Sequence, residues 1–434
     1  MVLPFFLVYI IAIVFIILKS HYRMLFNDMF WLGLSWVLSV GMYFFSGIKW
    51  GYPLSIFSAF YIGLCFVLFA FFRTQGIKTS VRLVKSPGKK KVPIPAGAYF
   101  VMGILGSCVY IWDYIRNNGV LVTKANYEIS ILGSIGNLFL PASLVLGLYH
   151  FAISFVNEKK ISIRAILCMA VYVIPCIING GRETILYLAV SVAAIMGYSM
   201  WKNRVSTKSR KNLKSFISKV IIAIVVIVLA NIVINVSNNR FGADVGNFYF
   251  RTLNAPESLH REAELFGSAK NIYQNIVFYF AHQLSRFEVV MQEYHGPYLL
   301  GMFELNIISR RLPAVFELDY QLVSEEMHRI MRGVQEGGLL RDGWSTILTS
   351  LIFDFGKWLT PLICGILGFV VGSARRRFMM DSSLANLVMV SIICMAMFTT
   401  IQLGPFFNFS VYGAFIWWHI MFKSRFAVCF SKQK

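Results

Sequence analysis

Apolar runs of membrane-crossing length alternate with shorter polar breaks along most of the chain. A helix needs about 20 residues to cross a hydrocarbon layer about 30 Å thick. The pattern therefore predicts an all-α integral membrane protein with about eleven transmembrane helices. The predicted spans are residues 2–18, 29–48, 54–72, 97–115, 130–154, 163–180, 184–201, 219–237, 357–374, 384–402 and 406–422.

One break, residues 238–342, is much longer than the others and predicts a large loop. It divides the chain into residues 1–237 with eight spans, the loop itself, and residues 343–434 with three spans. Loops of this length are usually functional or separately folded. Helical spacing of apolar residues predicts amphipathic helices at 272–291 and 324–334, and cap signals predict a helix start at 254–257. The apolar stretch 344–355, with Asp354 near its end, is too short to cross and predicts a re-entrant or interfacial helix.

Positive charge orients the predicted spans. Of the 41 Lys and Arg residues, 26 fall in short loops on one side, which makes that side cytoplasmic. The N-terminus is then outside, the C-terminus is cytoplasmic and the large loop faces away from the cytoplasm. The formal charge of +21 would suggest a nucleic-acid partner in a soluble protein. Its distribution on one side instead indicates a membrane surface, and no nucleic-acid partner is expected.

Composition agrees with a lipid environment, because 57% of the residues are hydrophobic and 14% are charged. Of the seven cysteines none lies in the large loop, so no disulfide framework is expected. Residues 2–18 lack a basic start and a small-residue cleavage site, which favours a retained span over a signal peptide. Common soluble-enzyme motifs are absent, and no cofactor or metal is expected. Glu317 and Asp319 form the acid-x-acid pattern of a metal site, which is the alternative.

The predicted outer loop is rich in arginine, and Lys270 is its only lysine. Guanidinium groups match phosphate oxygens better than ammonium groups do, so this bias indicates a phosphate ligand. Glu325, His328, Arg329 and Arg332 share one face of the predicted helix 324–334. That face could hold a phosphate beside an acid or base, or it could simply carry surface ion pairs between Glu325 and Arg329.

Two further places carry candidate residues with two open interpretations each. In the predicted helix 272–291, His282 and Arg286 are four residues apart; they either act on a ligand or form the solvated side of a helix lying flat on the membrane. Arg182 and Glu183 follow Gly180 and Gly181 in a tight turn that begins a span. This turn suits an anion, or else Arg182 extends to the interface and pairs with Glu183.

The spans, the late outer loop, the Gly180–Glu183 turn and the Gly343–Gly356 stretch resemble the bacterial oligosaccharide repeat-unit polymerases, which make O-antigen or capsule. Arg332 and Gly343 also match an Arg-x10-Gly pattern of some members. The resemblance implies a fold of the glycosyltransferase C type in the bacterial cytoplasmic (inner) membrane. The implied partners are undecaprenyl-pyrophosphate-linked oligosaccharides, membrane lipid and, as a candidate, a chain-length regulator protein.

The implied reaction transfers a growing glycan from its lipid carrier to a lipid-linked repeat unit, and fixed arginines would stabilise the pyrophosphate leaving group. Arg310 and Arg311 could instead hold lipid headgroups. The candidate bases are His328, His282, His260 and Glu183. The candidate pyrophosphate ligands are Arg182, Arg240, Arg286, Arg310, Arg311, Arg329, Arg332 and Arg341.

Two rival functions remain open from the sequence. An O-antigen ligase shares the lipid-linked donor and an outer loop rich in Arg and His, but delivers the glycan to the lipid A core. A polysaccharide flippase or transporter would line a path with polar residues along its spans. The predicted spans hold few, with Asp28 and Asp113 near span ends as the main cases.

Overall fold

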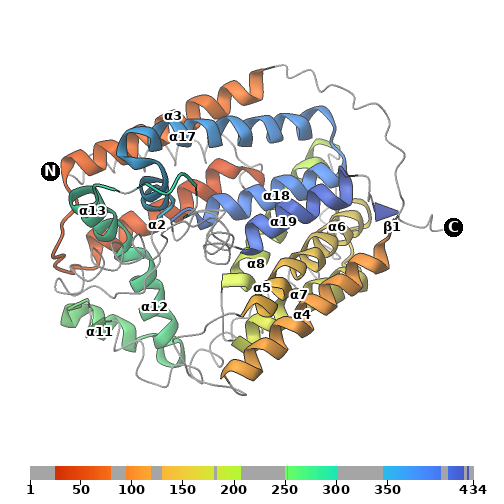
Figure 1. The fold of residues 1–434 in the computed structure, drawn as a ribbon, viewed down its shortest axis with the longest axis horizontal. Helices are drawn as coiled ribbons and strands as arrows, with labels where there is room; N and C mark the ends of the chain where they lie inside the picture. Colours follow the sequence, from red (N-terminus) through yellow and green to blue (C-terminus); the bar gives the residue numbers. More distant parts are fainter. Residues whose placement is uncertain are drawn as a thin grey trace.

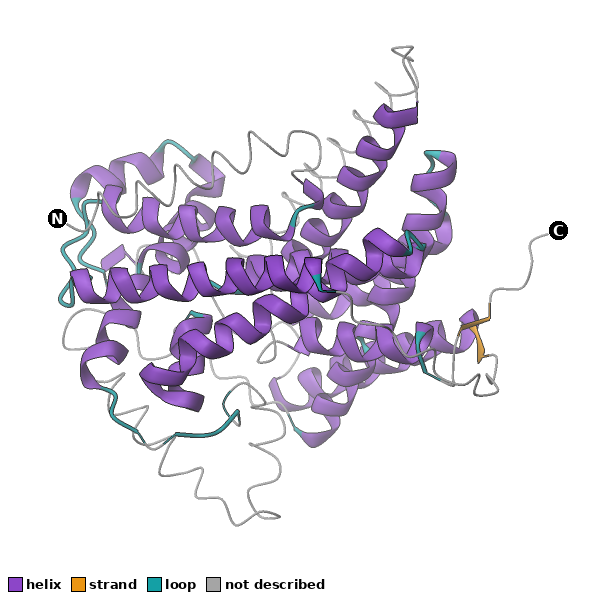
Figure 2. Ribbon diagram, turned by 90° about the horizontal axis from the view of Figure 1, so that it is seen from above, coloured by secondary structure: helices purple, strands orange, loops and turns teal. Residues whose placement is uncertain are grey.

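The chain is mostly helical, as its pattern predicts. The computed structural model describes residues 25–79, 94–118, 130–179, 183–206, 250–251, 253–296, 298–301, 303, 346–401, 409–424 and 428–429. Among these residues Figure 2 shows helices almost throughout, with one pair of very short strands at an edge of the molecule.

The helices follow the chain in an order that matches the predicted succession of spans. They are α2 (Asp28–Phe45), α3 (Ile56–Lys78), α4 (Ala96–Asn118), α5 (Ile131–Phe139), α6 (Pro141–Glu158), α7 (Ile163–Asn179), α8 (Glu183–Ser206), α11 (Glu257–Glu264), η2 (Gly267–Ala269), α12 (Lys270–Ala281), α13 (Gln283–Glu293), α17 (Ile347–Met380), α18 (Leu384–Thr399) and α19 (Phe409–Phe422). The strands are β1 (Ile94–Pro95) and β2 (Val428–Cys429).

Six described stretches are long and apolar enough to cross a membrane: Asp28–Phe45, Ile56–Lys78, Ala96–Asn117, Leu132–Glu158, Thr184–Lys202 and Ile347–Met380. Two more apolar helices, Ile163–Pro175 and Leu384–Thr399, are shorter. The predicted spans 2–18 and 219–237 lie outside the described residues. The total of about eleven spans therefore stays a prediction.

Helix starts follow the side chains that can cap them. Asn27, Ser55, Ser130, Thr346 and Ser383 each accept a hydrogen bond from a backbone N–H of the helix that follows. Such a cap satisfies one of the N–H groups that a helix leaves unpaired at its start. Polar residues at these positions thus fix where α2, α3, α5, α17 and α18 begin.

One helical boundary differs from the predicted spans, and another agrees with them. The predicted span 130–154 is formed by α5 and α6, which meet at Leu140 and Pro141. Pro141 has no N–H to donate, so the hydrogen-bond ladder is interrupted there. The predicted span 357–374 follows residues 347–355 of the predicted helix 344–355 directly within α17, and the non-helical backbone of Gly356 keeps them as two helical segments, as the sequence predicts.

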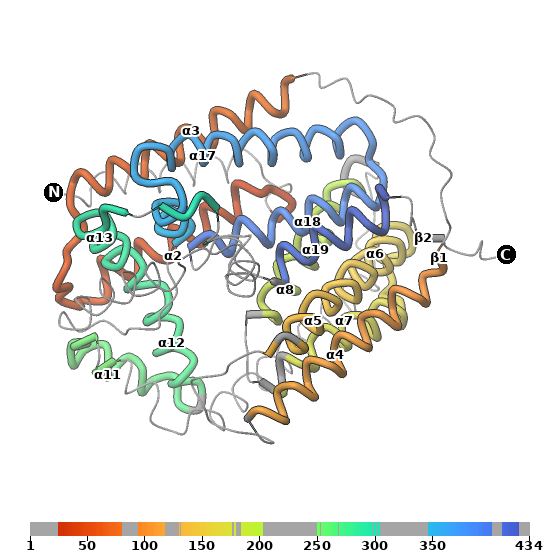
Figure 3. Tube along the Cα trace, viewed as in Figure 1, coloured from red at the N-terminus to blue at the C-terminus, as the bar shows by residue number. Residues whose placement is uncertain are grey.

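Figures 1 and 3 show α3 and α17 side by side along one edge of the molecule, with α4 to α7 grouped on the opposite side and α18 and α19 between them. α18 is central, because it contacts α2, α6, α8, α17 and α19. Most of its side chains are buried accordingly.

Glycines allow α3 and α17 to pack with their backbones in contact. A Cβ atom at Gly368 would overlap the carbonyl oxygen of Phe69, and one at Gly372 would overlap that of Arg73. On α3, a Cβ atom at Gly76 would overlap the carbonyl oxygen of Phe369. Small residues at such spacing are how helices approach closely in membranes, where the hydrophobic effect contributes little to association.

Several contacts join segments that the charge pattern predicts on the cytoplasmic side. β1, before α4, pairs in parallel with β2, after α19. Lys159, after α6, donates to the hydroxyl of Ser199 near the end of α8 at 2.6 Å. Arg376 donates to the carbonyl oxygen of Ile77 at 2.9 Å. The packing thus places together segments that the predicted topology places on one side.

Candidate functional site

The helices α12 and α13 dock on the ends of α2 and α3. The predicted helix 272–291 is found, but as two helices that meet at His282. The hydroxyl of Ser39 on α2 donates to the carbonyl oxygen of Phe280 at 2.7 Å, and the hydroxyl of Ser285 donates to that of Tyr52 at 2.9 Å. These bonds tie the junction of α12 and α13 to α2 and to the connection between α2 and α3.

His282 and Arg286 are both fully buried in this junction. The interpretation of their helix face as a solvated side is therefore wrong. It fails because α2 and the start of α17 pack against α12 and α13 and cover the polar side as well as the apolar one. Other polar side chains of α12 are buried too, namely those of Asn271, Gln274 and Asn275.

The imidazole of His282 has a fixed position. Its ring stacks on Phe278 with the ring centroids 4.4 Å apart, and its Nδ1 contacts the carbonyl oxygen of Phe278. A carbonyl oxygen only accepts, so this contact assigns the proton to Nδ1. In the neutral ring Nε2 is then the atom that can take a proton, which is the arrangement a general base needs.

Arg286 lies one helical turn after His282 and is the largest fully buried side chain in the described residues. A guanidinium group keeps its charge in proteins, so this buried position is permanently positive. Burying a charge is costly, and in membrane proteins buried ionisable residues usually belong to functional sites. His282 and Arg286 together therefore form the centre of the candidate site.

Glu288 orders the neighbouring backbone. Its carboxylate is also buried and accepts from the N–H of Ser55 at 2.9 Å and from Nε2 of Gln292 at 2.7 Å. Ser55 is in turn the cap of α3. The start of α3 and the middle of α13 are thus held together by one carboxylate.

The first segment of α17, residues 347–355, packs beside α13 and the residues that follow it. The carboxylate of Asp354 accepts from the N–H of Phe303 at 2.7 Å, and its carbonyl oxygen accepts from the N–H of Leu300 at 2.8 Å. The ring of Tyr294, just after α13, meets Phe353 edge-on with the centroids 4.7 Å apart. Residues 347–355 of the predicted helix 344–355 therefore form a buried helix against the segment that follows α13.

Gly356 separates this segment from the rest of α17. Its φ of +75° favours glycine, and an added Cβ atom would lie 2.9 Å from the ring of Tyr298. On the next turn, the hydroxyl of Tyr61 on α3 donates to the carbonyl oxygen of Lys357 at 2.6 Å. This carbonyl is near the break in the helix, where hydrogen-bond partners from other elements replace the helical ladder.

The structure brings together two of the predicted site residues, His282 and Arg286. Glu183 begins α8, and its side chain is not described. His260 lies on α11, with its ring 5.2 Å from that of Phe250. The other predicted site residues lie outside the described residues: Arg182, Arg240, Arg310, Arg311, His328, Arg329, Arg332 and Arg341, as do Glu317 and Asp319.

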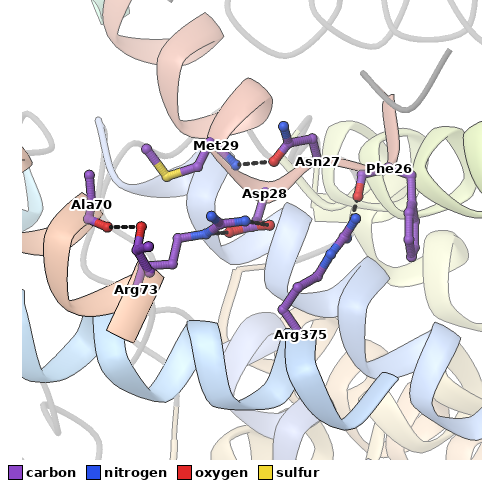
Figure 4. A network of polar contacts seen from close by, with 8 residues as sticks. Phe26, Asn27, Asp28, Met29, Ala70, Arg73 and Arg375 are labelled. Carbon is purple, nitrogen blue, oxygen red and sulfur yellow. Dashed lines mark hydrogen bonds and ion pairs between the residues drawn. The ribbon is translucent and has the colours of Figure 1, made fainter. Parts of the chain in front are cut away.

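A second buried charge network was missed by the sequence reasoning. Figure 4 shows Arg73, near the end of α3, beside Asp28 at the start of α2. Its Nε and Nη2 donate to the two carboxylate oxygens of Asp28 at 2.5 and 2.7 Å. Arg375 donates to the carbonyl oxygen of Phe26 at 2.5 Å and lies 4.1 Å above its ring. The sequence did single out Asp28 as an acid near a span end. Arg73 is at the matching end of the next predicted span, and this shared level could have predicted that the two residues pair.

In α12, which the sequence predicts to lie in the outer loop, one tyrosine has an altered pKa. Burial and the carboxylate of Glu262, to which its hydroxyl donates at 2.9 Å, raise the pKa of Tyr273 to about 12. This tyrosine therefore stays a neutral donor and joins α12 to α11. Within the described part of the chain, no group of three or more His, Cys, Asp and Glu side chains could hold a metal ion.

Comparison with protein families, curated proteins and solved structures finds no match for this chain.

Proposed function

We propose that the chain is a polysaccharide polymerase of the cytoplasmic membrane, with a fold of the glycosyltransferase C type. It joins undecaprenyl-pyrophosphate-linked repeat units into O-antigen or capsular polysaccharide at the outer face. The observation that carries the proposal is the buried pair of His282 and Arg286 in the large outer loop. The apolar helices support the membrane location, and the resemblance of the Gly180–Glu183 and Gly343–Gly356 segments supports the family.

In the proposed reaction, the bond between the anomeric carbon of the donor glycan and the pyrophosphate oxygen breaks. A hydroxyl of the acceptor sugar forms the new bond to that carbon and releases its proton. Negative charge grows on the leaving pyrophosphate, and a buried guanidinium stabilises it strongly because few water molecules screen the interaction. We assign this role to Arg286.

We assign the proton to Nε2 of His282, because Nδ1 is committed to the carbonyl oxygen of Phe278. His282 and Arg286 are four residues apart, which places their side chains on the same side of the helix. The acceptor hydroxyl and the leaving pyrophosphate can therefore meet there. The arginines predicted in the undescribed part of the loop would add further phosphate ligands.

The proposed topology has about eleven spans, an outer N-terminus and a cytoplasmic C-terminus. The contacts between same-side segments, such as that of Arg376 with Ile77, are those that this topology requires. A ligase would use the same donor at the same site, so the acceptor is what distinguishes the two activities.

The test uses purified full-length protein with synthetic lipid-linked repeat units, in EDTA. We expect chain growth with repeat units as acceptor and none with lipid A core. Transfer to the core alone would assign the ligase function, and a strict requirement for divalent metal would contradict an arginine-only mechanism and direct attention to Glu317 and Asp319.

Variants connect the activity to the site. Arg286→Lys keeps a positive charge but loses the planar fork, and we expect turnover to fall about 10²–10³-fold. The matched control is Arg261→Gln in the same loop, whose side chain is 76% exposed and pairs with Glu257 across a helical turn. Unchanged turnover in Arg286→Lys, with native thermal stability, would remove Arg286 from the mechanism.

A further inference from the structure

An apolar slot lies between α2, α3, α17, α18 and α19, and His282 and Arg286 are not among its lining residues. Its volume is about 250 Å³. Ile347 and Leu348 line it at the start of α17, residues from Cys364 to Ala374 line it further along that helix, and residues from Met389 to Met397 line it on α18. The longer α17 stretch and the α18 stretch fix its direction. At a rise of 1.5 Å per residue these stretches span about 15 and 12 Å. The slot is therefore elongated along the helices.

The chemistry of the slot is that of hydrocarbon. Its polar lining side chain is Thr400, whose hydroxyl already accepts from the indole of Trp36 at 3.1 Å and donates to the carbonyl oxygen of Met397 at 2.8 Å. The other lining residues are apolar, with the thiols of Cys65 and Cys364 among them. A ligand with a polar group inside the slot would lose its hydration without a partner. Shape and polarity together fit one extended hydrocarbon chain.

The slot reaches the lipid-facing surface near one end of α17. Exposed residues recur along α17 at helical spacing, namely Trp358, Leu359, Leu362, Ile366 and Val370. Val370 is both a member of this stripe and a lining residue of the slot. A lipid chain can therefore enter beside Val370, about one turn before the basic end of α17.

That end of the bundle is positively charged. The described ends of α2, α3 and α17 carry the cations Arg73, Lys78, Arg375, Arg376 and Arg377 and the acids Asp28 and Asp381. Arg73 is committed to Asp28, whereas Arg377 and Lys78 are exposed. An anionic headgroup beside them would be attracted to these cations.

We propose that this slot binds one acyl chain of an anionic phospholipid, whose phosphate lies at Arg377 and Lys78. The lipid belongs to the leaflet at the basic end of α17 and is distinct from the glycan donor of the proposed function. The inference depends on the slot and the charges alone and does not require the polymerase activity.

The test is photo-crosslinking of the full-length protein in nanodiscs with phosphatidylglycerol that carries a diazirine in one acyl chain. We expect the label on slot residues of α3, α17 and α18. Ala374→Leu narrows the slot near its mouth and should reduce this labelling at least about fivefold, because an added side chain competes for the same volume. Val67→Phe, at a lipid-facing position of α3 that does not line the slot, is the matched control and should leave labelling unchanged.

Arg377→Gln should weaken labelling by phosphatidylglycerol and leave the weaker labelling by a zwitterionic phosphatidylcholine probe unaffected. Three results would overturn the proposal: equal labelling by both probes, label spread over Phe60, Leu64 and Val67 without response to Ala374→Leu, or displacement of the label by polyprenyl phosphate. The last result would assign the slot to an isoprenoid chain instead.

Discussion

At the scale of single residues, two clusters of buried charge lie at opposite ends of α3. The start of α3 lies beside Glu288 and the junction that holds Arg286, whereas its end carries Arg73 against Asp28. Removing each charge from water costs free energy, and specific partners offset this desolvation cost, as the two hydrogen bonds between Arg73 and Asp28 do. The two clusters should therefore respond differently to substitution, one in activity and the other in stability.

Asp28→Asn leaves the guanidinium of Arg73 without its counter-charge. We expect a loss of about 3–5 kcal/mol in unfolding free energy, since breaking one side of a buried pair exposes the full desolvation cost of the other. The measurement is unfolding in mixed micelles with increasing denaturing detergent. The exchanged pair Asp28→Arg with Arg73→Asp should recover part of the loss, and an Asp28→Asn protein as stable as the parent would show that the pair contributes nothing.

Gly356→Ala tests the break in α17. The positive φ and the nearby ring of Tyr298 both oppose a side chain, and strain of this kind costs about 1–3 kcal/mol. Adding Tyr298→Ala to the Gly356→Ala protein should restore only the part of the lost unfolding free energy that is due to the tyrosine ring. Full rescue by Tyr298→Ala would mean that the backbone angle carries no cost. Gly41→Ala, in an open position of α2, is the control and should be neutral.

At the scale of elements, apolar length located most helices because crossing a membrane demands it. The same criterion separated the stretch 344–355 from the span 357–374, and the positive φ of Gly356 does divide α17 between them. However, it merged α5 with α6, although Pro141 was visible in the sequence as an interruption. The sequence could not predict that α3 packs against α17. This contact depends on which helix lies against the glycines of α17, and a single sequence does not contain that information.

The glycine contact of these two helices is open to a direct test. Gly368→Leu should separate α3 from α17, because the new side chain would overlap the backbone of Phe69. The free thiols of Cys65 on α3 and Cys364 on α17 line the same slot between these helices, so a bifunctional reagent that fluoresces only after joining two thiols can report the separation. We expect the fluorescence to be lost in Gly368→Leu and kept in Gly41→Ala. Equal fluorescence in all three proteins would show that the helices stay together without the glycine.

At the scale of the whole molecule, the asymmetry of charge predicts which end faces the cytoplasm. The structure places the predicted same-side segments together, but charge alone assigns the side. For the candidate site, the sequence predicted which residues could take part but not how they are buried or packed. His282 and Arg286 were recognisable by spacing, whereas their burial results from packing against α2 and α17, which a single sequence does not reveal.

Single cysteines introduced at exposed positions test the orientation. Glu264→Cys at the end of α11 should react in intact cells with a membrane-impermeant maleimide, because the proposed topology places the loop 238–342 away from the cytoplasm. Lys160→Cys, between α6 and α7, should react only after permeabilisation. The opposite pattern would invert the predicted topology and remove the proposed reaction from the outer face.

The pairing of α3 with α17 also has a consequence for how the protein is made. Phe69 and Gly368 are 299 positions apart, so at 5–20 residues per second the ribosome needs roughly 15–60 s to supply the partner of α3. Arg73, by contrast, has its carboxylate partner only 45 positions earlier, already synthesised. The pair of α2 and α3 can therefore form in the bilayer with its charge neutralised, and the face of α3 that later packs against Gly368 and Gly372 stays without its partner during that interval.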